Sequence, residues 1–181
     1  KYLSVSVNED GTVNVLDKQT GKNYEGLAYF EDTLDAGNEY IYFCPKTSPA
    51  ILTKGSKACV KLVENNSFEA AVEITHVLTV PVSADEKLKQ EQESLVGFYN
   101  RTCGRSSETV DLEIRTVVTL EKDSRTLKFK TEFDNKAKDH RLRVVMPTGI
   151  SCTHHYADSV FEVVKRPNEH SKLWVNPSKC E

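Results

Sequence analysis

The sequence lacks the features that would indicate a nucleic-acid-binding or membrane-spanning protein. Its longest apolar runs are only a few residues long, so no segment predicts a helix that crosses a bilayer. Lysine and arginine together number 24, aspartate and glutamate 27, and the formal charge is −3. This balance predicts no basic surface for nucleic acid or for an anionic membrane. We therefore expect a soluble protein that has neither partner.

Cysteine is sparse and gives no sign of a disulfide framework. The five cysteines are an odd number, lie far apart and form no CxxC pair: Cys44, Cys59, Cys103, Cys152 and Cys180. This pattern favours reduced thiols, so we expect a cytoplasmic protein. The chain begins with Lys1 rather than methionine, which leads us to expect a piece of a longer protein. Its 181 residues suit one domain with a substantial core.

What the sequence does contain is a repeated alternation of apolar and polar side chains, which is typical of half-buried strands. Three antiparallel pairs joined by polar turns are predicted: residues 3–7 with 12–16, 58–63 with 68–80, and 110–120 with 125–133. Only residues 84–93 have a helix-like composition, and their few apolar positions favour a solvated loop with one or two helical turns. Many strands with almost no helix predict an all-β protein, an antiparallel β-sandwich.

The clearest local pattern lies in residues 128–148. Alternation over residues 128–134 predicts one strand, and polar turn residues follow it. Alternation over residues 141–146 predicts a second strand, which Pro147 ends because proline cannot donate to a strand ladder. We interpret these two strands as antiparallel partners.

A strongly acidic segment covers residues 31–39, around Gly37. Its carboxylates belong to Glu31, Asp32, Asp35 and Glu39. The segment is too polar for a packed element, so it predicts a solvated loop that leads into a strand over the aromatic run at residues 40–43.

Several stretches together resemble the C-terminal β-domain of glycoside hydrolase family 38, the α-mannosidases, and most of all its bacterial members. The longest ungapped match is DNKAKDHRLRV at residues 134–144, followed by MPT at 146–148. Shorter matches extend it over nearly the whole chain: NEDGT at 8–12, DKQTG at 17–21, YFED at 29–32, DAGNEY at 35–40, ADS at 157–159 and VVKRP at 163–167.

The resemblance implies a galactose-mutarotase-like supersandwich, with residues 1–181 forming all or most of one C-terminal domain. In that family the nucleophile and the zinc ligands come mostly from an N-terminal barrel, which this sequence does not contain. We therefore expect no catalytic residue, metal ligand or cofactor in this chain. The expected partners are the catalytic barrel of the same polypeptide and a mannoside substrate.

The resemblance also implies two substrate-binding residues, because family 38 β-domains contribute a tyrosine and an arginine to the sugar pocket. Tyr40 is the best match for the tyrosine and Arg166 for the arginine. A phenol can stack on or hydrogen-bond to a pyranose, and a guanidinium can donate to hydroxyls or to a carboxylate. The alternatives are that Tyr40 is a core aromatic of its strand and that Arg166 is a solvated strand-end residue.

Residues that could support chemistry within the chain itself have simpler interpretations. Glycoside hydrolysis needs two carboxyls about 5 to 5.5 Å apart for retention or further apart for inversion, and nothing in the acidic segment fixes such a pair. Cys152, His154, His155 and Asp158 are close in sequence, but a strand places His154 and His155 on opposite faces. We expect ordinary loop or strand-end residues at both places.

Two groups of arginines each have two interpretations. Arg141 and Arg143 share a strand face near Asp139, and we favour anchors for an interface with the missing barrel over a surface charge pair. Arg101 and Arg105 flank Cys103, where nearby cations could lower the pKa of the thiol. No histidine-containing nucleophile motif surrounds Cys103, so a plain loop cysteine is favoured.

The sequence thus predicts the C-terminal domain of an enzyme that hydrolyses terminal α-mannosides, packing on the barrel and contributing to the sugar pocket. The alternative is a free-standing carbohydrate-binding or interaction module without catalysis. A large apolar patch on one face would favour the first function, and a self-contained aromatic groove the second.

Overall fold

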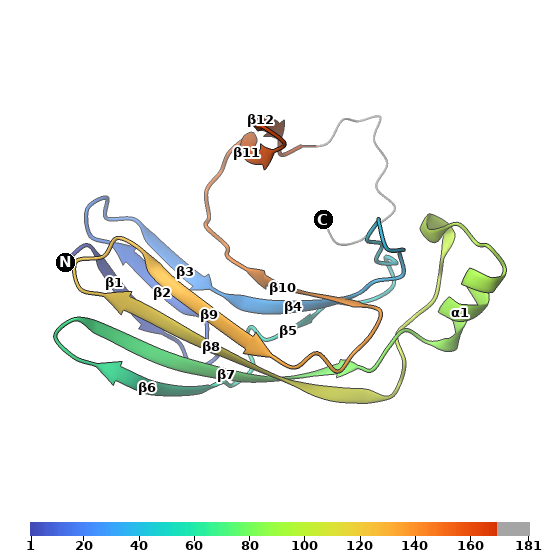
Figure 1. Ribbon diagram of the computed structural model, residues 1–181, viewed down its shortest axis with the longest axis horizontal. Coiled ribbons are helices and arrows are strands. Elements are labelled where there is room, and N and C mark those ends of the chain that lie inside the picture. Colours follow the sequence, from blue (N-terminus) through green and yellow to red (C-terminus); the bar gives the residue numbers. More distant parts are fainter. Residues whose placement is uncertain (170–181) are drawn as a thin grey trace.

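The computed structural model describes residues 1–169, which form two facing layers of antiparallel strands and a short helical insertion (Figure 1). The elements are β1 (Leu3–Val7), β2 (Val13–Asp17), β3 (Asn23–Leu27), β4 (Tyr29–Leu34), β5 (Ile51–Leu52), β6 (Cys59–Asn65), β7 (Glu69–Pro81), α1 (Glu86–Glu93), the 3-10 turn η1 (Phe98–Asn100), β8 (Thr109–Glu121), β9 (Leu127–Phe133), β10 (His140–Val145), β11 (His154–Ser159) and β12 (Glu162–Pro167). The all-β prediction is confirmed. Within these residues, no helix has the length and apolar character needed to cross a bilayer.

The larger layer is a four-stranded sheet with the order β6-β7-β8-β9. Strands β7 and β8 pair along their full lengths of 13 residues. Buried side chains of β8 occupy every second position, at Leu112, Ile114, Thr116 and Val118. The alternation of apolar and polar side chains therefore determines which face of this sheet is buried. Two predicted strand pairs, residues 58–63 with 68–80 and 110–120 with 125–133, are confirmed.

The facing layer consists of two short sheets, β1-β2-β3 and β10-β4-β5. The predicted pairing of residues 3–7 with 12–16 is confirmed in the first of them. Val13 of β2 packs on Ile74 of the large sheet, and Phe30 of β4 packs in a second cluster with Leu112. Full burial of side chains of this size stabilises a fold by roughly 1.5–3 kcal/mol each. The two clusters hold the layers face to face.

The predicted pairing of residues 128–134 with 141–146 is wrong. Strand β10 pairs antiparallel with β4 in the facing layer, with Arg143 opposite Glu31. The residues between β9 and β10 cross from one layer to the other, with Ala137 buried in the core between them. Alternation indicates which side chains are buried, but it does not identify the neighbouring strand.

The prediction of an acidic loop over residues 31–39 is wrong in its first half. Residues 31–34 belong to β4, and Asp32 is fully buried, with 0% of its surface exposed. The predicted strand at residues 40–43 is also wrong, because those residues form no ladder. Phe30, Asp32 and Leu34 alternate on the inward face of β4, which places one carboxylate in the core.

The insertion between β7 and β8 contains the two helical elements α1 and η1 (Figure 1, right). Asp85 caps α1 by accepting a hydrogen bond from the Lys87 N–H at 3.1 Å. The prediction of a short helical segment is confirmed, but the segment is not fully solvated. Leu88 and Glu91 are buried, and Leu88 packs in a third core cluster with Phe43 and Cys103.

Candidate functional site

The loop that follows β4, residues 35–43, is closed on itself by hydrogen bonds; we call it the Tyr40 loop. The Asp35 carboxylate accepts hydrogen bonds from the N–H groups of Gly37 and Phe43, at 2.9 and 3.2 Å. A side chain at Gly37 would place its Cβ only 1.8 Å from the carbonyl oxygen of Ile41. The loop therefore has a compact backbone that its own side chains stabilise.

The side chain of Tyr40 points away from the protein and is 87% exposed. Its backbone N–H donates to the Asn38 side-chain oxygen at 2.9 Å, which fixes the main chain at this position. The two following aromatic residues behave differently, since the Tyr42 hydroxyl donates to Thr33 at 2.9 Å and Phe43 is buried. The alternative interpretation of Tyr40 as a core aromatic is therefore wrong.

A polar cavity of about 380 Å³ lies beside the Tyr40 loop. Its polar lining side chains come from the loop, α1 and the start of β10: Asp35, Asn38, Glu39, Gln92, Asp139 and His140. Carboxylates accept hydrogen bonds from hydroxyl groups, and the amide side chains can donate as well as accept. The cavity thus offers groups that can bind a polyhydroxylated molecule.

A buried network of charged and polar side chains adjoins the cavity through His140, which belongs to both. The sequence analysis does not predict this network. Asp32 Oδ1 accepts a hydrogen bond from Arg105 Nη1 at 2.6 Å, and Asp32 Oδ2 lies 2.5 Å from His140 Nδ1. The other ring nitrogen of His140, Nε2, lies 3.0 Å from the side-chain oxygen of Asn135. A buried carboxylate needs such partners. The alternation of Asp32 with Phe30 was the signal that could have identified it.

Arg166 lies in the two-stranded sheet β11-β12, opposite His155. Its side chain is exposed, and Figure 1 shows this hairpin standing apart from the two main layers. Tyr40 lies in the loop after β4 and Arg166 in this hairpin, so the two predicted substrate-binding residues come from separate parts of the described chain.

The histidine pair on β11 is exposed, and each side chain has a different neighbour. His154 Nδ1 lies 2.9 Å from the Thr153 hydroxyl, and His155 Nδ1 lies 2.6 Å from the Asn168 side-chain oxygen. Nowhere in residues 1–169 do three or more histidine, cysteine, aspartate or glutamate side chains gather as they would around a metal ion.

Cys59, Cys103 and Cys152 are free thiols; Cys180 lies outside the described residues. Cys103 is fully buried, and burial together with the carboxylates of Glu91 and Asp85 raises the pKa of its thiol to about 11. Arg101 lowers the pKa, but by less than burial and the two carboxylates raise it. The favoured interpretation of a plain loop cysteine fits this environment.

The arginines of β10 make contacts within the domain. Arg143 Nη2 lies 2.6 Å from Glu31 Oε1, and the Arg141 guanidinium carbon lies 4.3 Å from the centre of the Tyr42 ring. Arg143 therefore has its partner on the neighbouring strand β4, and Arg141 has its partner in the Tyr40 loop.

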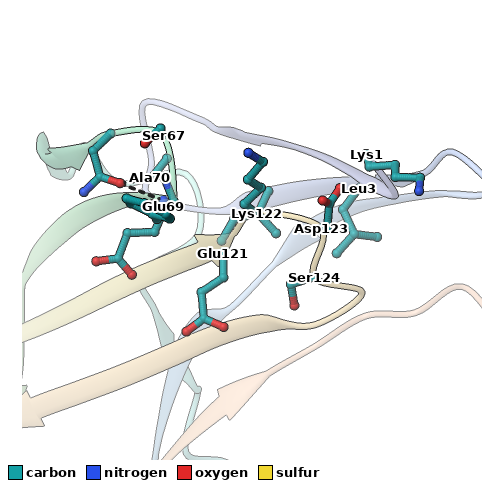
Figure 2. A pocket seen from close by; sticks show the side chains of 12 residues that line it. Lys1, Leu3, Ser67, Glu69, Ala70, Glu121, Lys122, Asp123 and Ser124 are labelled. Carbon is teal, nitrogen blue, oxygen red and sulfur yellow. Dashed lines mark hydrogen bonds between the residues drawn. The ribbon is translucent and has the colours of Figure 1, made fainter.

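Other concave surfaces lie away from α1. A cavity of about 250 Å³ with both polar and apolar lining lies where the β6–β7 and β8–β9 turns meet. Figure 2 shows Glu69, Lys122 and Asp123 around it. The Lys122 N–H donates to the Phe68 carbonyl at 2.6 Å and joins the two turns. Phe68 is the one aromatic residue in its lining.

An apolar groove of about 290 Å³ adjoins this cavity, and its lining is entirely aliphatic: Val5, Val7, Val60, Leu62, Ala70, Val72, Val118, Leu120 and Leu127. Two of these residues, Val60 and Leu62, are exposed on the edge strand β6, as is their neighbour Val63. Exposed aliphatic surface of this kind favours packing against protein over a self-contained aromatic sugar groove.

Comparison with known proteins identifies the family. Residues 1–178 match the family model described as the glycosyl hydrolases family 38 C-terminal domain. The chain belongs to this family. It is 42% identical over 176 residues to a protein of Halalkalibacterium halodurans named as a candidate mannosylglycerate hydrolase, covering 97% of this chain and 20% of that protein.

Solved structures of family 38 proteins share the fold. An α-mannosidase from Enterococcus faecalis V583 superposes with a TM-score of 0.93 and 41% identity, over 97% of this chain and 20% of that one. A second family 38 structure from Enterococcus faecalis gives a TM-score of 0.89 at 41% identity, over 92% and 20% of the two chains. The family 38 chain described here thus spans about one fifth of the length of these relatives.

Proposed function

We propose that this family 38 domain is part of an enzyme that hydrolyses terminal α-mannosides, and that it packs on the catalytic barrel of the same polypeptide. The observation that carries the proposal is the superposition of 97% of the chain, at a TM-score of 0.93, on one fifth of an α-mannosidase. The exposed aliphatic residues of β6 support a packing role. Because the Halalkalibacterium relative is named for mannosylglycerate, a mannoside of glycerate is a second substrate to test.

Within that enzyme, the Tyr40 loop would face the sugar. Tyr40 has a fixed backbone and an exposed ring, which suits stacking on a pyranose or hydrogen bonding to its hydroxyls. Arg166 is exposed on β12 and can donate to sugar hydroxyls or to a carboxylate. Neither residue cleaves the bond; both bind the substrate.

The catalytic chemistry would come from the barrel. In the proposed enzyme the barrel supplies the nucleophile and a zinc ion, which orients the sugar when bound. By this proposal the zinc ligands would come from the barrel as well. We also propose a cytoplasmic location, which the free thiol of Cys103 supports.

The test is hydrolysis of an aryl α-mannoside by the full polypeptide and its variants. Tyr40→Ala is expected to lower kcat/KM about 10-fold or more, since the loss of one good contact corresponds to about 1–1.5 kcal/mol. Arg166→Ala is expected to act in the same direction, and a zinc chelator should abolish activity. Phe68→Ala provides the matched control, because Phe68 is also an exposed aromatic residue but lies at the other end of the sandwich. Equal rates for Tyr40→Ala and Phe68→Ala would overturn the role of Tyr40.

The second candidate function is a free-standing carbohydrate-binding module, favoured by the polar cavity beside Tyr40. It predicts that the chain binds mannosides without the barrel. Calorimetric titration with methyl α-mannoside would detect this, and binding that disappears in Tyr40→Ala would support the module over the enzyme domain.

A further inference from the structure

A segment far from the Tyr40 loop in sequence lies against it in the fold. Arg101, which follows η1, directs its guanidinium Nη1 at the carbonyl oxygens of Ala36 and Gly37, both at 2.6 Å. Nearby, the ring of Phe98 packs edge to face on Phe43 with centroids 6.1 Å apart. The insertion therefore contacts the loop at its turn and at its far end.

The Arg101 hydrogen bonds act at the point that determines where Tyr40 lies. They involve a charged donor, and such bonds are about twice as strong as neutral ones. Gly37 precedes Asn38, whose side-chain oxygen accepts the Tyr40 N–H at 2.9 Å. A shift of the Gly37 carbonyl would therefore move Asn38 and the Tyr40 backbone with it.

Arg101 is itself anchored. Its backbone N–H donates to the Phe98 carbonyl at 3.1 Å, and the next residue, Thr102, donates from both its N–H and its hydroxyl to Glu91 Oε1 at 2.9 Å. Asp85, the N-cap of α1, also accepts the Gly104 N–H at 2.9 Å. The guanidinium thus extends from a backbone that η1 fixes at Arg101 and that α1 fixes at the residues after it.

We propose that Arg101 is a positioning residue for substrate binding: by binding the carbonyls of Ala36 and Gly37 it fixes the Tyr40 loop so that the Tyr40 ring is held ready for the sugar. Arg101 does not touch the sugar and acts through Tyr40. This inference rests on the function of Tyr40 proposed above. It also assigns a purpose to the helical insertion, which supports the loop rather than completing either layer.

The first experiment measures the loop directly, by amide hydrogen exchange in the full polypeptide. Arg101→Met removes the donors and keeps an apolar side chain, and we expect the amides of residues 36–41 to exchange at least about 10-fold faster, since their local opening becomes easier. Arg101→Lys keeps the charge and should give an intermediate rate. Arg115→Met is the control, because Arg115 pairs with Glu132 on the outer face of the large sheet. Unchanged exchange in Arg101→Met would overturn the proposal.

The second experiment asks whether Arg101 acts through Tyr40, by a double-mutant cycle on kcat/KM for an aryl α-mannoside. We expect Arg101→Met to lower kcat/KM about 10-fold, mainly through KM, and the double variant with Tyr40→Ala to be no worse than Tyr40→Ala alone. Arg101→Lys should recover part of the loss, and unchanged exchange in β7 and β8 verifies that the variants are folded.

The possible failures are distinguishable. Additive effects of Arg101→Met and Tyr40→Ala would overturn the positioning role while leaving Tyr40 as a substrate-binding residue. If Tyr40→Ala alone leaves kcat/KM unchanged, the proposed function of Tyr40 is wrong. The positioning role of Arg101 in substrate binding is then wrong as well, whatever the exchange rates in the loop.

Discussion

Strands β7 and β8 are determined by local alternation, whereas the Tyr40 loop depends on side chains from distant parts of the chain. The strands pair along 13 residues with a buried side chain at every second position of β8. The loop is bound by Arg101 from the insertion and lies beside Asp139 and His140 at the start of β10. The difference suggests that changes in the sheet should lower stability, while changes in the loop should mainly alter the geometry of Tyr40.

The largest expected effect is at Asp32, which lies in β4 shortly before the Tyr40 loop. Asp32→Ala leaves Arg105 buried without its carboxylate partner, and removal of one partner of a buried pair typically costs 3–5 kcal/mol, so we expect a loss of about that size. Urea denaturation measures it. Glu132→Ala is the control, because Glu132 pairs with Arg115 on the exposed face and should matter far less. Similar losses for the two variants would contradict a structural role for the buried network.

Next in size is Leu112 in the centre of the large sheet. Leu112→Ala removes a fully buried side chain, and we expect a loss of about 2–5 kcal/mol in the free energy of unfolding. Leu62→Ala is the matched control, since Leu62 is 64% exposed on the edge strand β6. In the full polypeptide, a large effect of Leu62→Ala would instead indicate that β6 is covered there by another part of the protein.

These two sites also define how far the sequence could predict the fold. The burial of Leu112 follows from alternation alone, as does the pairing across the turn at residues 122–124. The partner of β10 did not follow, because an alternating strand fits any sheet that buries the same face. The burial of Asp32 did not follow either, because the acidic composition of residues 31–39 favours a solvated loop and masks the alternation of Phe30, Asp32 and Leu34.

The candidate site was predicted less well than the fold. The resemblance to family 38 indicated Tyr40, and its exposure agrees with a binding role, although the assignment itself stays a prediction. The sequence presents Arg101 and Arg105 only as neighbours of Cys103, because the partners of their guanidinium groups lie 64 or more positions away. No local pattern encodes such contacts.

A smaller effect on stability is expected in the loop. Gly37→Ala would place a Cβ 1.8 Å from the Ile41 carbonyl oxygen, so the backbone must shift, and overpacking of this kind costs about 1–3 kcal/mol. We expect a clear rise in KM for an aryl α-mannoside in the full polypeptide. Gly97→Ala is the control, because its added Cβ would make an ordinary contact 3.4 Å from Tyr99. An unchanged KM in Gly37→Ala would contradict the claim that the geometry of the Tyr40 loop determines sugar binding.

The smallest effect concerns pH and the anchoring of Arg101. Burial would raise the pKa of Glu91, but hydrogen bonds from Thr102 and Cys103 outweigh it and lower the pKa below its ordinary value of 4.5. A lowered pKa means that Glu91 contributes stability above pH 4.5 and that this contribution is lost as the pH falls through the lowered value. The difference in unfolding free energy between the wild type and Glu91→Gln should therefore shrink in acid. A constant difference across this range would contradict the assigned contacts.

The most direct test of the central claim compares the isolated 181-residue chain with the full polypeptide in hydrolysis of an aryl α-mannoside. We predict turnover by the full polypeptide and none by the chain alone, because in our proposal this domain only helps the barrel to bind the sugar and the barrel cleaves it. Cleavage by the isolated chain, at a rate that survives zinc chelation, would contradict this account and would direct attention to the carboxylates of Asp35, Glu39 and Asp139 around the polar cavity.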